Sequence, residues 1–138
     1  MKRNCVEIRL LIKDRVIAKK EKKTGVERKM TEDFYCDEVL SGKTPVKKVM
    51  ETANVLAYYH TKPFYPVHIV AIPKRHIPSL ITLEDSDNEL LLELFSVIKK
   101  VAAEVTAAHG ACRVITNLGN YQDSKHLHWH IVSGAPLK

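Results

Sequence analysis

The chain has 138 residues, of which 45% are hydrophobic and 28% are charged. This composition predicts a soluble globular domain with a hydrophobic core, and the sequence contains neither an internal repeat nor a low-complexity segment. No apolar run is long enough to span a bilayer and no signal-peptide pattern opens the chain, so we expect a cytoplasmic protein with no membrane partner.

The net charge of +6 is unevenly distributed along the chain. Residues 1–30 hold 11 Lys or Arg against four Asp or Glu, a net +7, whereas residues 31–138 carry 11 against 12, a net −1. The basic character therefore belongs to the N-terminal part alone. A basic extension can contact phosphates, but more often it is a solvated segment, so nucleic acid is not the partner we expect.

The first 30 residues predict an extension that precedes the folded domain. Over residues 5–20, β-branched residues alternate roughly with polar ones, which favours a short hairpin and leaves a helix as the alternative. A lysine-rich run over residues 19–25 then breaks the apolar pattern, as a linker does. We therefore divide the chain into a basic extension, residues 1–30, and a domain, residues 31–138.

Between residues 34 and 73 the sequence predicts one short helix and three strands. These are a helix over 34–40, two paired strands over 46–51 and 55–59, and a third strand over 67–72. Ser41 and Gly42 are expected to stop the helix. The third strand is a nearly continuous apolar run closed by Pro73, as a central strand is, and it contains His68.

The second half of the domain predicts one long helix followed by two strands. Over residues 85–108, apolar residues recur at spacings of three and four, and Gly110 supplies the stop. A strand over 112–116 and a turn over 117–120 follow. Hairpin strands with one dominant helix predict an α+β fold, in which an antiparallel sheet of about five strands carries one long helix and one short helix.

The last predicted strand contains a histidine at every second position. Residues 126–132 read His-Leu-His-Trp-His-Ile-Val. Because side chains alternate between the two faces of a strand, three imidazoles should share one face while Leu, Trp and Ile share the other. Each buried imidazole needs a polar partner, and each exposed one adds little to stability. The pattern therefore indicates a reaction centre.

Three kinds of chemistry are open to such a histidine row. Two imidazoles can bind Zn²⁺, one can act as the base for a Ser or Cys nucleophile, or one can itself attack phosphorus. No Ser or Cys lies in a Gly-x-Ser-x-Gly turn, which disfavours the second. For the third, His128 is the natural nucleophile because a histidine flanks it on each side, and Asn117, Gln122 and Ser124 are neutral donors just upstream.

Four stretches of the chain resemble one known family. Residues 126–132 resemble the signature His-φ-His-φ-His-φ-φ, with φ apolar, of the histidine triad (HIT) superfamily. Residues 34–45 are similar to the opening helix and turn of that family, and residues 55–59 resemble its next strand. Residues 66–77 read Pro-Val-His-Ile-Val-Ala-Ile-Pro-Lys-Arg-His-Ile, which is similar to its His-x-x-x-x-Pro-Lys-x-His stretch.

The resemblance implies a small HIT-like fold, usually a homodimer, that binds a purine nucleotide with its α-phosphate against the histidine triplet. It also implies cleavage of a phosphoanhydride or phosphoramidate bond through a covalent nucleotidyl-histidine. By motif position His128 would be the nucleophile, and His126 and His130 would position it and contact phosphate. His68 would support the site, and Gln122, with Asn117, would bind phosphate or leaving group.

Some positions depart from the family pattern. His60 stands where relatives commonly carry an acidic residue for the ribose hydroxyls, so His60 is expected to take that contact. Asp123 stands where a Ser is frequent, and a carboxylate there would repel phosphate unless it turns away or carries a proton. Some bacterial relatives bind zinc through Cys-x-x-Cys, but here Asp33 replaces the first of those cysteines and only Cys36 remains. We therefore expect no metal and no other cofactor.

The expected function is that of a nucleotide hydrolase or nucleotidyl transferase acting on a phosphoramidate or a dinucleoside polyphosphate. The segment 133–136 loosely resembles the purine nucleoside phosphoramidase branch, which favours the first substrate class. Two alternatives remain open at this point. One is a zinc-dependent hydrolase with the triplet as ligands. The other is a non-catalytic nucleotide-binding or RNA-binding module that uses residues 1–30.

Overall fold

The structure is a computed structural model that describes residues 33–137. The predicted extension, residues 1–30, lies outside the described residues, so its hairpin and the domain boundary at residue 31 stay predictions. Among the described helices, none has both the length and the apolar character that a bilayer crossing requires.

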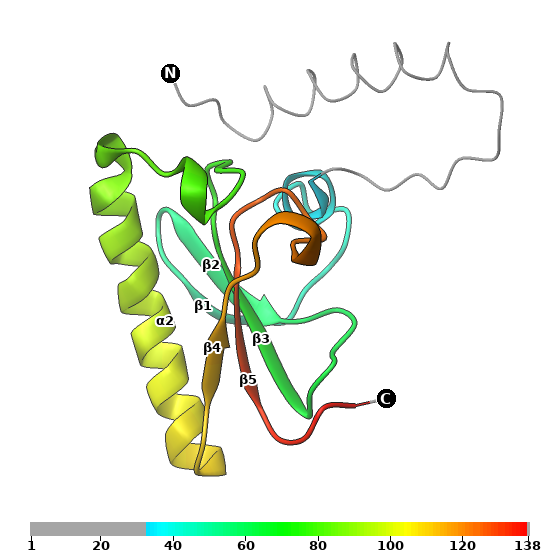
Figure 1. The fold of residues 1–138 in the computed structure, drawn as a ribbon. Coiled ribbons are helices and arrows are strands. Elements are labelled where there is room, and N and C mark those ends of the chain that lie inside the picture. Colours follow the sequence, from blue (N-terminus) through cyan, green and yellow to red (C-terminus); the bar gives the residue numbers. More distant parts are fainter. Residues whose placement is uncertain (1–32, 138) are drawn as a thin grey trace, which may run out of the picture.

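The domain is built on a five-stranded antiparallel sheet in the order β1-β2-β3-β5-β4 (Figure 1). The strands are β1 (Lys48–Glu51), β2 (Val55–Tyr59), β3 (Val67–Pro73), β4 (Arg113–Ile115) and β5 (Trp129–Ser133). The predicted strand count and the central place of the third strand are confirmed. β3 holds the centre because its side chains are buried on both faces of the sheet.

One long helix, α2 (Asn88–His109), covers one face of the sheet (Figure 1). It buries an apolar stripe at helical spacing, which consists of Leu94, Val97, Ile98, Val101 and Val105. The helix ends as predicted at Gly110, whose φ of 81° is the left-handed conformation that glycine adopts easily. It begins three residues later than predicted, because Asp85–Asp87 form a separate 3-10 turn, η3.

The opposite face of the sheet is covered by η1 (Tyr35–Val39), the predicted short helix. Its turn is wider than an α-helical one, with the Leu40 N–H donating to the Tyr35 carbonyl at 2.7 Å. Tyr35 and Val39 pack on Tyr58 and on other residues of β2 and β3. The sheet therefore has two apolar cores, a larger one under α2 and a smaller one under η1.

The alternation predicted for the histidine stretch places its apolar residues in the core under α2. This core contains Leu127, Trp129 and Ile131. The strand itself is shorter than predicted, because β5 begins only at Trp129. Residues 126–128 precede the strand, and the Leu127 N–H donates to the carbonyl of Ile77 at 2.6 Å instead of to a neighbouring strand of the sheet. Two of the three histidines are therefore held by a loop and only His130 by the strand.

The connections after β3 and β4 contain the remaining 3-10 turns. They are η2 (Leu80–Thr82), which precedes η3 and α2, and η4 (Gly119–Tyr121), which lies between β4 and the histidine stretch. The second of these corresponds to the turn predicted over 117–120. It brings the residues just upstream of the histidines to the same end of the sheet.

Candidate active site

His128 lies just before β5 with its ring pressed against that of Tyr35. The two ring centroids are 4.8 Å apart, and only 5% of the His128 side chain is exposed. Its Nδ1 lies 2.7 Å from the His126 carbonyl oxygen. Because a carbonyl oxygen can only accept, Nδ1 carries the proton and Nε2 keeps a lone pair. Burial lowers the pKa of His128, so the ring is neutral at physiological pH.

The backbone around His128 is held in place from the neighbouring strand. Thr116, which follows β4, donates its hydroxyl proton to the carbonyl of His128 at 2.8 Å. His126 Nε2 lies 2.7 Å from the carbonyl oxygen of Pro73 at the end of β3. These contacts replace the ladder hydrogen bonds that residues 126–128 lack. They fix the direction in which the His128 ring projects.

His68 and His130 form a second pair of imidazoles beside His128. In the β3–β5 register Val70 lies opposite His130 and His68 opposite Val132, so the two histidines are diagonal neighbours on one face. Their rings meet with His68 Nε2 2.9 Å from His130 Nδ1. The Phe64 N–H donates to His68 Nδ1 at 3.0 Å. The proton of neutral His68 therefore lies on Nε2 and points to His130.

This order of hydrogen bonds also fixes the tautomer of His130. Because His130 Nδ1 accepts the proton of His68, a neutral His130 carries its own proton on Nε2. Burial lowers the pKa of His68 to about 4 and the pKa of His130 to about 3. Both rings are thus neutral at physiological pH. His130 offers an N–H donor next to the unprotonated Nε2 of His128, whose ring centroid is 4.9 Å away.

These histidines line a cavity of about 840 Å³. Its other polar lining residues include Lys62, Asn117, Asp123 and Ser124, and aromatic side chains complete the wall. Ser124 Oγ accepts the Phe34 N–H at 3.2 Å, which leaves the hydroxyl proton for a bound group. The volume is large enough for a nucleotide-sized ligand.

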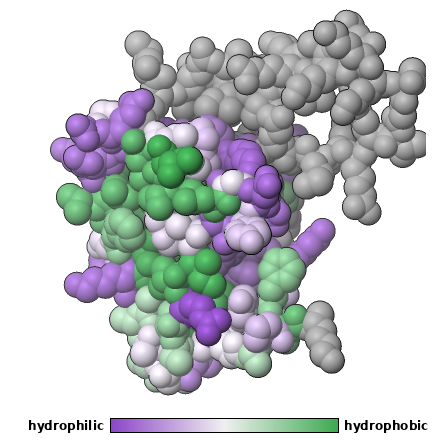
Figure 2. All heavy atoms as spheres, in the orientation of Figure 1, coloured by the Kyte–Doolittle hydropathy of each residue, from purple (hydrophilic) through white to green (hydrophobic). Residues whose placement is uncertain are grey.

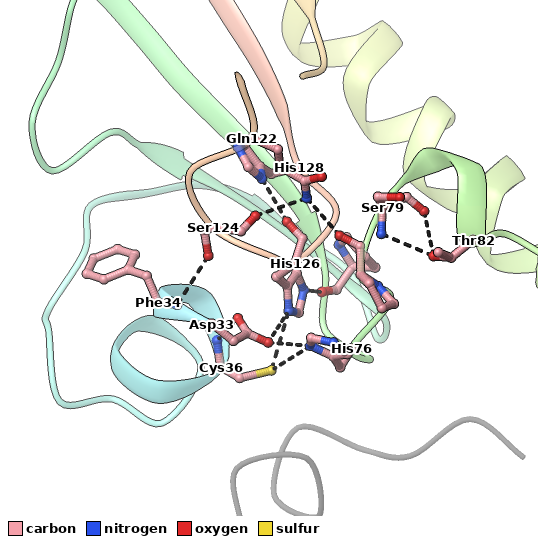
Figure 3. Close-up of polar contacts among 12 residues, drawn as sticks. Asp33, Phe34, Cys36, His76, Ser79, Thr82, Gln122, Ser124, His126 and His128 are labelled. Atoms are coloured by element: carbon pink, nitrogen blue, oxygen red, sulfur yellow. Dashed lines mark hydrogen bonds and ion pairs between the residues drawn. The ribbon is translucent and has the colours of Figure 1, made fainter. Parts of the chain in front are cut away.

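Three of the four predicted nucleotide-binding residues, Asn117, Ser124 and His60, line this cavity. His60 stacks on His68 with ring centroids 4.3 Å apart. The fourth, Gln122, is only 4% exposed and does not line it. Its amide donates instead to the carbonyls of Pro78 and Ser124, at 2.7 and 2.9 Å, and so braces the loop (Figure 3).

Among the four predicted catalytic histidines, His126 alone lies outside the cavity. Its side chain is fully buried, with Nδ1 3.1 Å from Asp33 Oδ2 (Figure 3). The same carboxylate oxygen pairs with His76 Nδ1. Burial by itself would raise the pKa of Asp33, but the hydrogen bonds of His126 and His76 outweigh it and hold that pKa well below its usual range. Asp33 is therefore a carboxylate.

The position of Asp33 was not anticipated from the sequence. Asp33 and Cys36 were noted only as remnants of a Cys-x-x-Cys, and His76 only as part of the stretch 66–77. The signal that could have found this buried cluster is the combination of Asp33-x-x-Cys36 with His76 and His126, since all four types bind metals. Tyr35, which packs against His128, was also missed, because an aromatic residue in a short helix predicts only core.

Two groups of described residues bring potential metal-ligand atoms within 4.8 Å of one another. One is His60, His68 and His130 at the cavity. A metal-ligating histidine offers a lone pair on one nitrogen and keeps its proton on the other. Nδ1 of His60 already accepts the N–H of Lys62, and Nδ1 of His68 that of Phe64, so both protons lie on Nε2. This tautomer leaves no lone pair for a metal and disfavours the zinc-dependent alternative.

The second group is Asp33, Cys36, His76 and His126, all of them buried. His126 Nε2 donates to the carbonyl oxygen of Pro73, and His126 Nδ1 lies 3.1 Å from Asp33 Oδ2. A buried carboxylate and two imidazoles are donor types that can bind a metal ion.

Comparison with known proteins agrees with this arrangement. A family model described as the HIT domain matches residues 41–137. An uncharacterized 13.2 kDa HIT-like protein from Azospirillum brasilense is 33% identical over 102 residues, which cover 72% of this chain and 84% of the relative. An uncharacterized HIT-like protein from Synechocystis is 33% identical over 109 residues, 78% of this chain and 96% of the relative.

Solved structures give the same result. A histidine triad protein from Clostridium difficile superposes with a TM-score of 0.65 at 36% identity, covering 82% of this chain and 97% of that one. A HIT family hydrolase from Legionella pneumophila gives a TM-score of 0.64 at 30% identity, covering 71% and 89%. Residues 41–137, which the family model matches, include the histidine stretch and β3. The chain is therefore a member of the HIT family.

Proposed function

We propose that the protein is a nucleotide hydrolase or nucleotidyl transferase that acts through a covalent nucleotidyl-histidine at His128. The observation that carries this proposal is the tautomer of His128. Its Nδ1–H donates to the His126 carbonyl. Its Nε2 makes no hydrogen bond with any described residue, and the ring lines the cavity. An unprotonated nitrogen in a cavity is the nucleophile that in-line attack on phosphorus requires.

The first step follows from the positions of these protons. His128 Nε2 attacks the α-phosphorus, the bond from phosphorus to the leaving group breaks, and the amine of a phosphoramidate leaves with one proton taken up from solvent. The His130 Nε2–H and the Ser124 hydroxyl donate hydrogen bonds to the phosphoryl oxygens or to the departing atom. In the second step the oxygen of a water molecule bonds to phosphorus, the bond from phosphorus to His128 Nε2 breaks, and one proton returns to solvent. This step releases the nucleoside monophosphate and restores the lone pair on His128.

The nucleoside is proposed to bind along the aromatic wall of the cavity. Tyr35, Tyr58, Phe64 and Tyr65 line it and offer ring faces to a purine. His60, whose neutral ring carries its proton on Nε2, offers a donor to a ribose hydroxyl where relatives use an acidic acceptor. Burial lowers the pKa of His60, which keeps this ring neutral.

Asp123 favours a phosphoramidate over a dinucleoside polyphosphate as substrate. It lines the cavity close to His128, and the structure gives its carboxylate no hydrogen bond with a described residue. A departing amine takes up a proton and gains from a nearby negative charge, whereas a departing polyphosphate carries several negative charges that the carboxylate repels. This charge argument agrees with the phosphoramidase branch favoured by the sequence.

We also propose a homodimer formed through α2 and β4. β4 is an edge strand whose outer side has no partner among the described residues, and Val114 on it is 43% exposed. On α2, Leu92 is 72% exposed and Phe95 43% exposed. Figure 2 shows apolar residues gathered on the face that carries these elements. A second copy would cover both the open edge and the apolar side chains.

Replacing the nucleophile tests the covalent step. His128→Asn should lower kcat on a purine nucleoside phosphoramidate by at least about a thousandfold, because no other described lone pair faces the phosphorus. Nucleoside monophosphate should still bind, since the aromatic wall is intact. Quenched-flow mass spectrometry should detect one nucleotidyl group on the wild type and none on the variant. His109→Asn, at the C-terminal end of α2, is the matched control, and full activity of His128→Asn would end the proposal.

The pH dependence tests the neutral state of the imidazoles. Burial lowers the pKa of His128 below the ordinary histidine value of about 6.5, so the nucleophile stays unprotonated below that pH. The rate should fall only where protonation begins, so the acid limb of kcat/KM for a phosphoramidate should lie below about pH 6.5. An acid limb at or above that value would contradict the assignment.

Selectivity between leaving groups tests the role of Asp123. Asp123→Asn keeps the shape of the side chain and removes its charge. The ratio of kcat/KM for a dinucleoside polyphosphate to that for an amine phosphoramidate should rise roughly fivefold, which corresponds to about 1 kcal/mol of repulsion near a solvated surface. Steady-state kinetics on both substrates give the ratio. An unchanged ratio would mean that the carboxylate does not face the leaving group.

Sedimentation velocity tests the dimer. The wild type should sediment as a dimer, and Leu92→Glu should shift it to the monomer by placing a charge in the apolar interface. Leu137→Glu is the control, because Leu137 is also exposed but belongs to neither α2 nor β4. A monomeric wild type, or a Leu92→Glu variant that stays dimeric, would refute this interface.

A further inference from the structure

Two side chains of opposite charge, Lys62 and Asp123, line the cavity. They lie in different parts of it. Burial lowers the pKa of both His128 and His60, and the Asp123 carboxylate opposes this effect only at His128. Lys62 instead adjoins His60, because its backbone N–H donates to His60 Nδ1 at 3.0 Å. The cavity therefore has an acidic end beside His128 and a basic end beside His60.

Another imidazole separates the basic end from His128. The ring centroid of His130 lies 4.9 Å from that of His128 and 5.9 Å from that of His60. His60 also stacks on His68, which fixes the plane of its ring. A nucleotide whose 5′-phosphate lies against His128 can therefore bring its sugar to His60.

The contact with the Lys62 N–H determines what His60 can offer to a sugar. Because Nδ1 accepts that N–H, the neutral ring carries its proton on Nε2 and is a hydrogen-bond donor there. A donor of this kind cannot accept the protons of two ribose hydroxyls, as a carboxylate can. It forms its strongest hydrogen bond with a charged acceptor such as a phosphate oxygen.

The turn after His60 adds a positive charge and a hydroxyl to the same end. Lys62 is exposed, and the ion pairs found among the described residues do not include it. Thr61, which lies between the two, also lines the cavity. An ammonium group, a hydroxyl and an imidazole N–H can all donate to one phosphate group. Because Lys62 and Thr61 are exposed, such a phosphate would keep part of its hydration.

We propose that the basic end of the cavity, which consists of His60, Thr61 and Lys62, binds a phosphate group on the 2′ or 3′ oxygen of the ribose. This inference rests on the proposed function, since it assumes that the 5′-phosphate lies at His128. The substrates would then be purine nucleoside 5′-phosphoramidates with a second phosphate on the sugar. In dinucleotide-binding proteins an acidic residue likewise binds a free ribose hydroxyl, whereas a basic residue accommodates a 2′-phosphate.

Affinities of nucleotides that contain no cleavable bond to a leaving group test the assignment. The full chain is titrated by calorimetry with adenosine 5′-monophosphate, adenosine 2′,5′-bisphosphate and adenosine 3′,5′-bisphosphate. At least one bisphosphate should bind about tenfold more tightly than the monophosphate at low salt, because it adds charge-assisted hydrogen bonds. Added salt should reduce this advantage, since Lys62 is exposed. Equal affinities for all three nucleotides would overturn the proposal.

Adenosine 5′-diphosphate is the matched ligand for total charge. It carries two phosphates, but both extend from the 5′ oxygen, toward the end of the cavity that contains Asp123. The titration uses His128→Asn, so that turnover does not contribute to the signal. The diphosphate should bind no more tightly than the monophosphate, because the Asp123 carboxylate repels its second phosphate. An advantage as large as that of the bisphosphates would show that the position of the phosphate does not matter, and the proposal would fail.

Substitutions at the basic end test which residues recognise the sugar phosphate. Lys62→Gln should reduce the advantage of the bisphosphate from about tenfold to less than about threefold, because the side chain loses its charge. His60→Asp should abolish it, since a carboxylate repels phosphate. Lys100→Gln is the matched control and should keep the full advantage, because Lys100 is an exposed lysine of α2 that does not line the cavity.

The wild-type affinities remain decisive if a variant does not fold, which its Tm would reveal. An unchanged advantage of the bisphosphate in folded Lys62→Gln and His60→Asp would overturn the assignment to these residues.

A sugar phosphate can belong to a free nucleotide or to the 5′ end of a nucleic acid. A 5′-phosphorylated adenylyl dinucleotide, in which the 3′ phosphate is a diester, distinguishes these sources. An advantage confined to the bisphosphates would support the proposal with a free nucleotide as ligand. An equal advantage for the dinucleotide would support it with a nucleic-acid end as ligand.

Failure of this inference can be distinguished from failure of the proposed function. Turnover of a phosphoramidate by a protein that binds the monophosphate and both bisphosphates equally would refute the sugar-phosphate site and leave the proposed function standing. A Lys62-dependent advantage of a bisphosphate in a protein that forms no nucleotidyl-histidine would do the reverse.

Discussion

The hydrogen bond from His128 to the carbonyl of His126 is the interaction on which the arrangement of the site depends. It connects residues only two positions apart, so no distant element is needed to set the tautomer of His128, the proposed nucleophile. This contact requires the chain to leave the extended strand conformation, in which a side chain projects away from the backbone carbonyl two residues earlier. This explains why β5 begins at Trp129 and why loop contacts, not ladder bonds, hold residues 126–128.

The cavity imidazoles work as neutral donors and acceptors. Burial lowers the pKa of His68 and His130. The Phe64 N–H donates to His68 Nδ1, and His68 Nε2–H donates to His130 Nδ1, so the proton of His130 lies on Nε2. At these imidazoles an anion meets directed N–H groups, and Lys62 is the lysine among the lining residues. Donors that are already oriented need no reorganisation when charge develops on a bound group.

Much of the fold followed from periodicity. β3 was predicted from its apolar run, and α2 from apolar residues at spacings of three and four, because these patterns reflect which side chains are buried. The end of α2 was predicted from Gly110. Of the predicted site residues, His60, His68, His128 and His130 line the cavity, and their roles stay predictions. Alternation in a strand could not reveal that His126 turns away from the cavity, because its destination depends on Asp33, which lies 93 positions earlier.

Gln122 shows the same limit of sequence reasoning. An amide near a phosphate site predicts a ligand contact, but two backbone carbonyls lie within reach of its nitrogen and an unpaired buried carbonyl is costly. The amide therefore braces the loop. The expectation that no metal binds was drawn from the missing cysteine alone and stays a prediction.

His126 joins the two halves of this arrangement because its side chain and its carbonyl face different partners. The ring takes part in the buried cluster with Asp33, and the carbonyl orients His128 at the cavity. His126 can therefore influence the orientation of His128 without lining the cavity. Because Asp33 and the Pro73 carbonyl hold the ring of His126, the nitrogen that we propose as the nucleophile is oriented before any ligand binds. Because the side chain is ordered beforehand, no conformational entropy is lost in ordering it when a ligand binds.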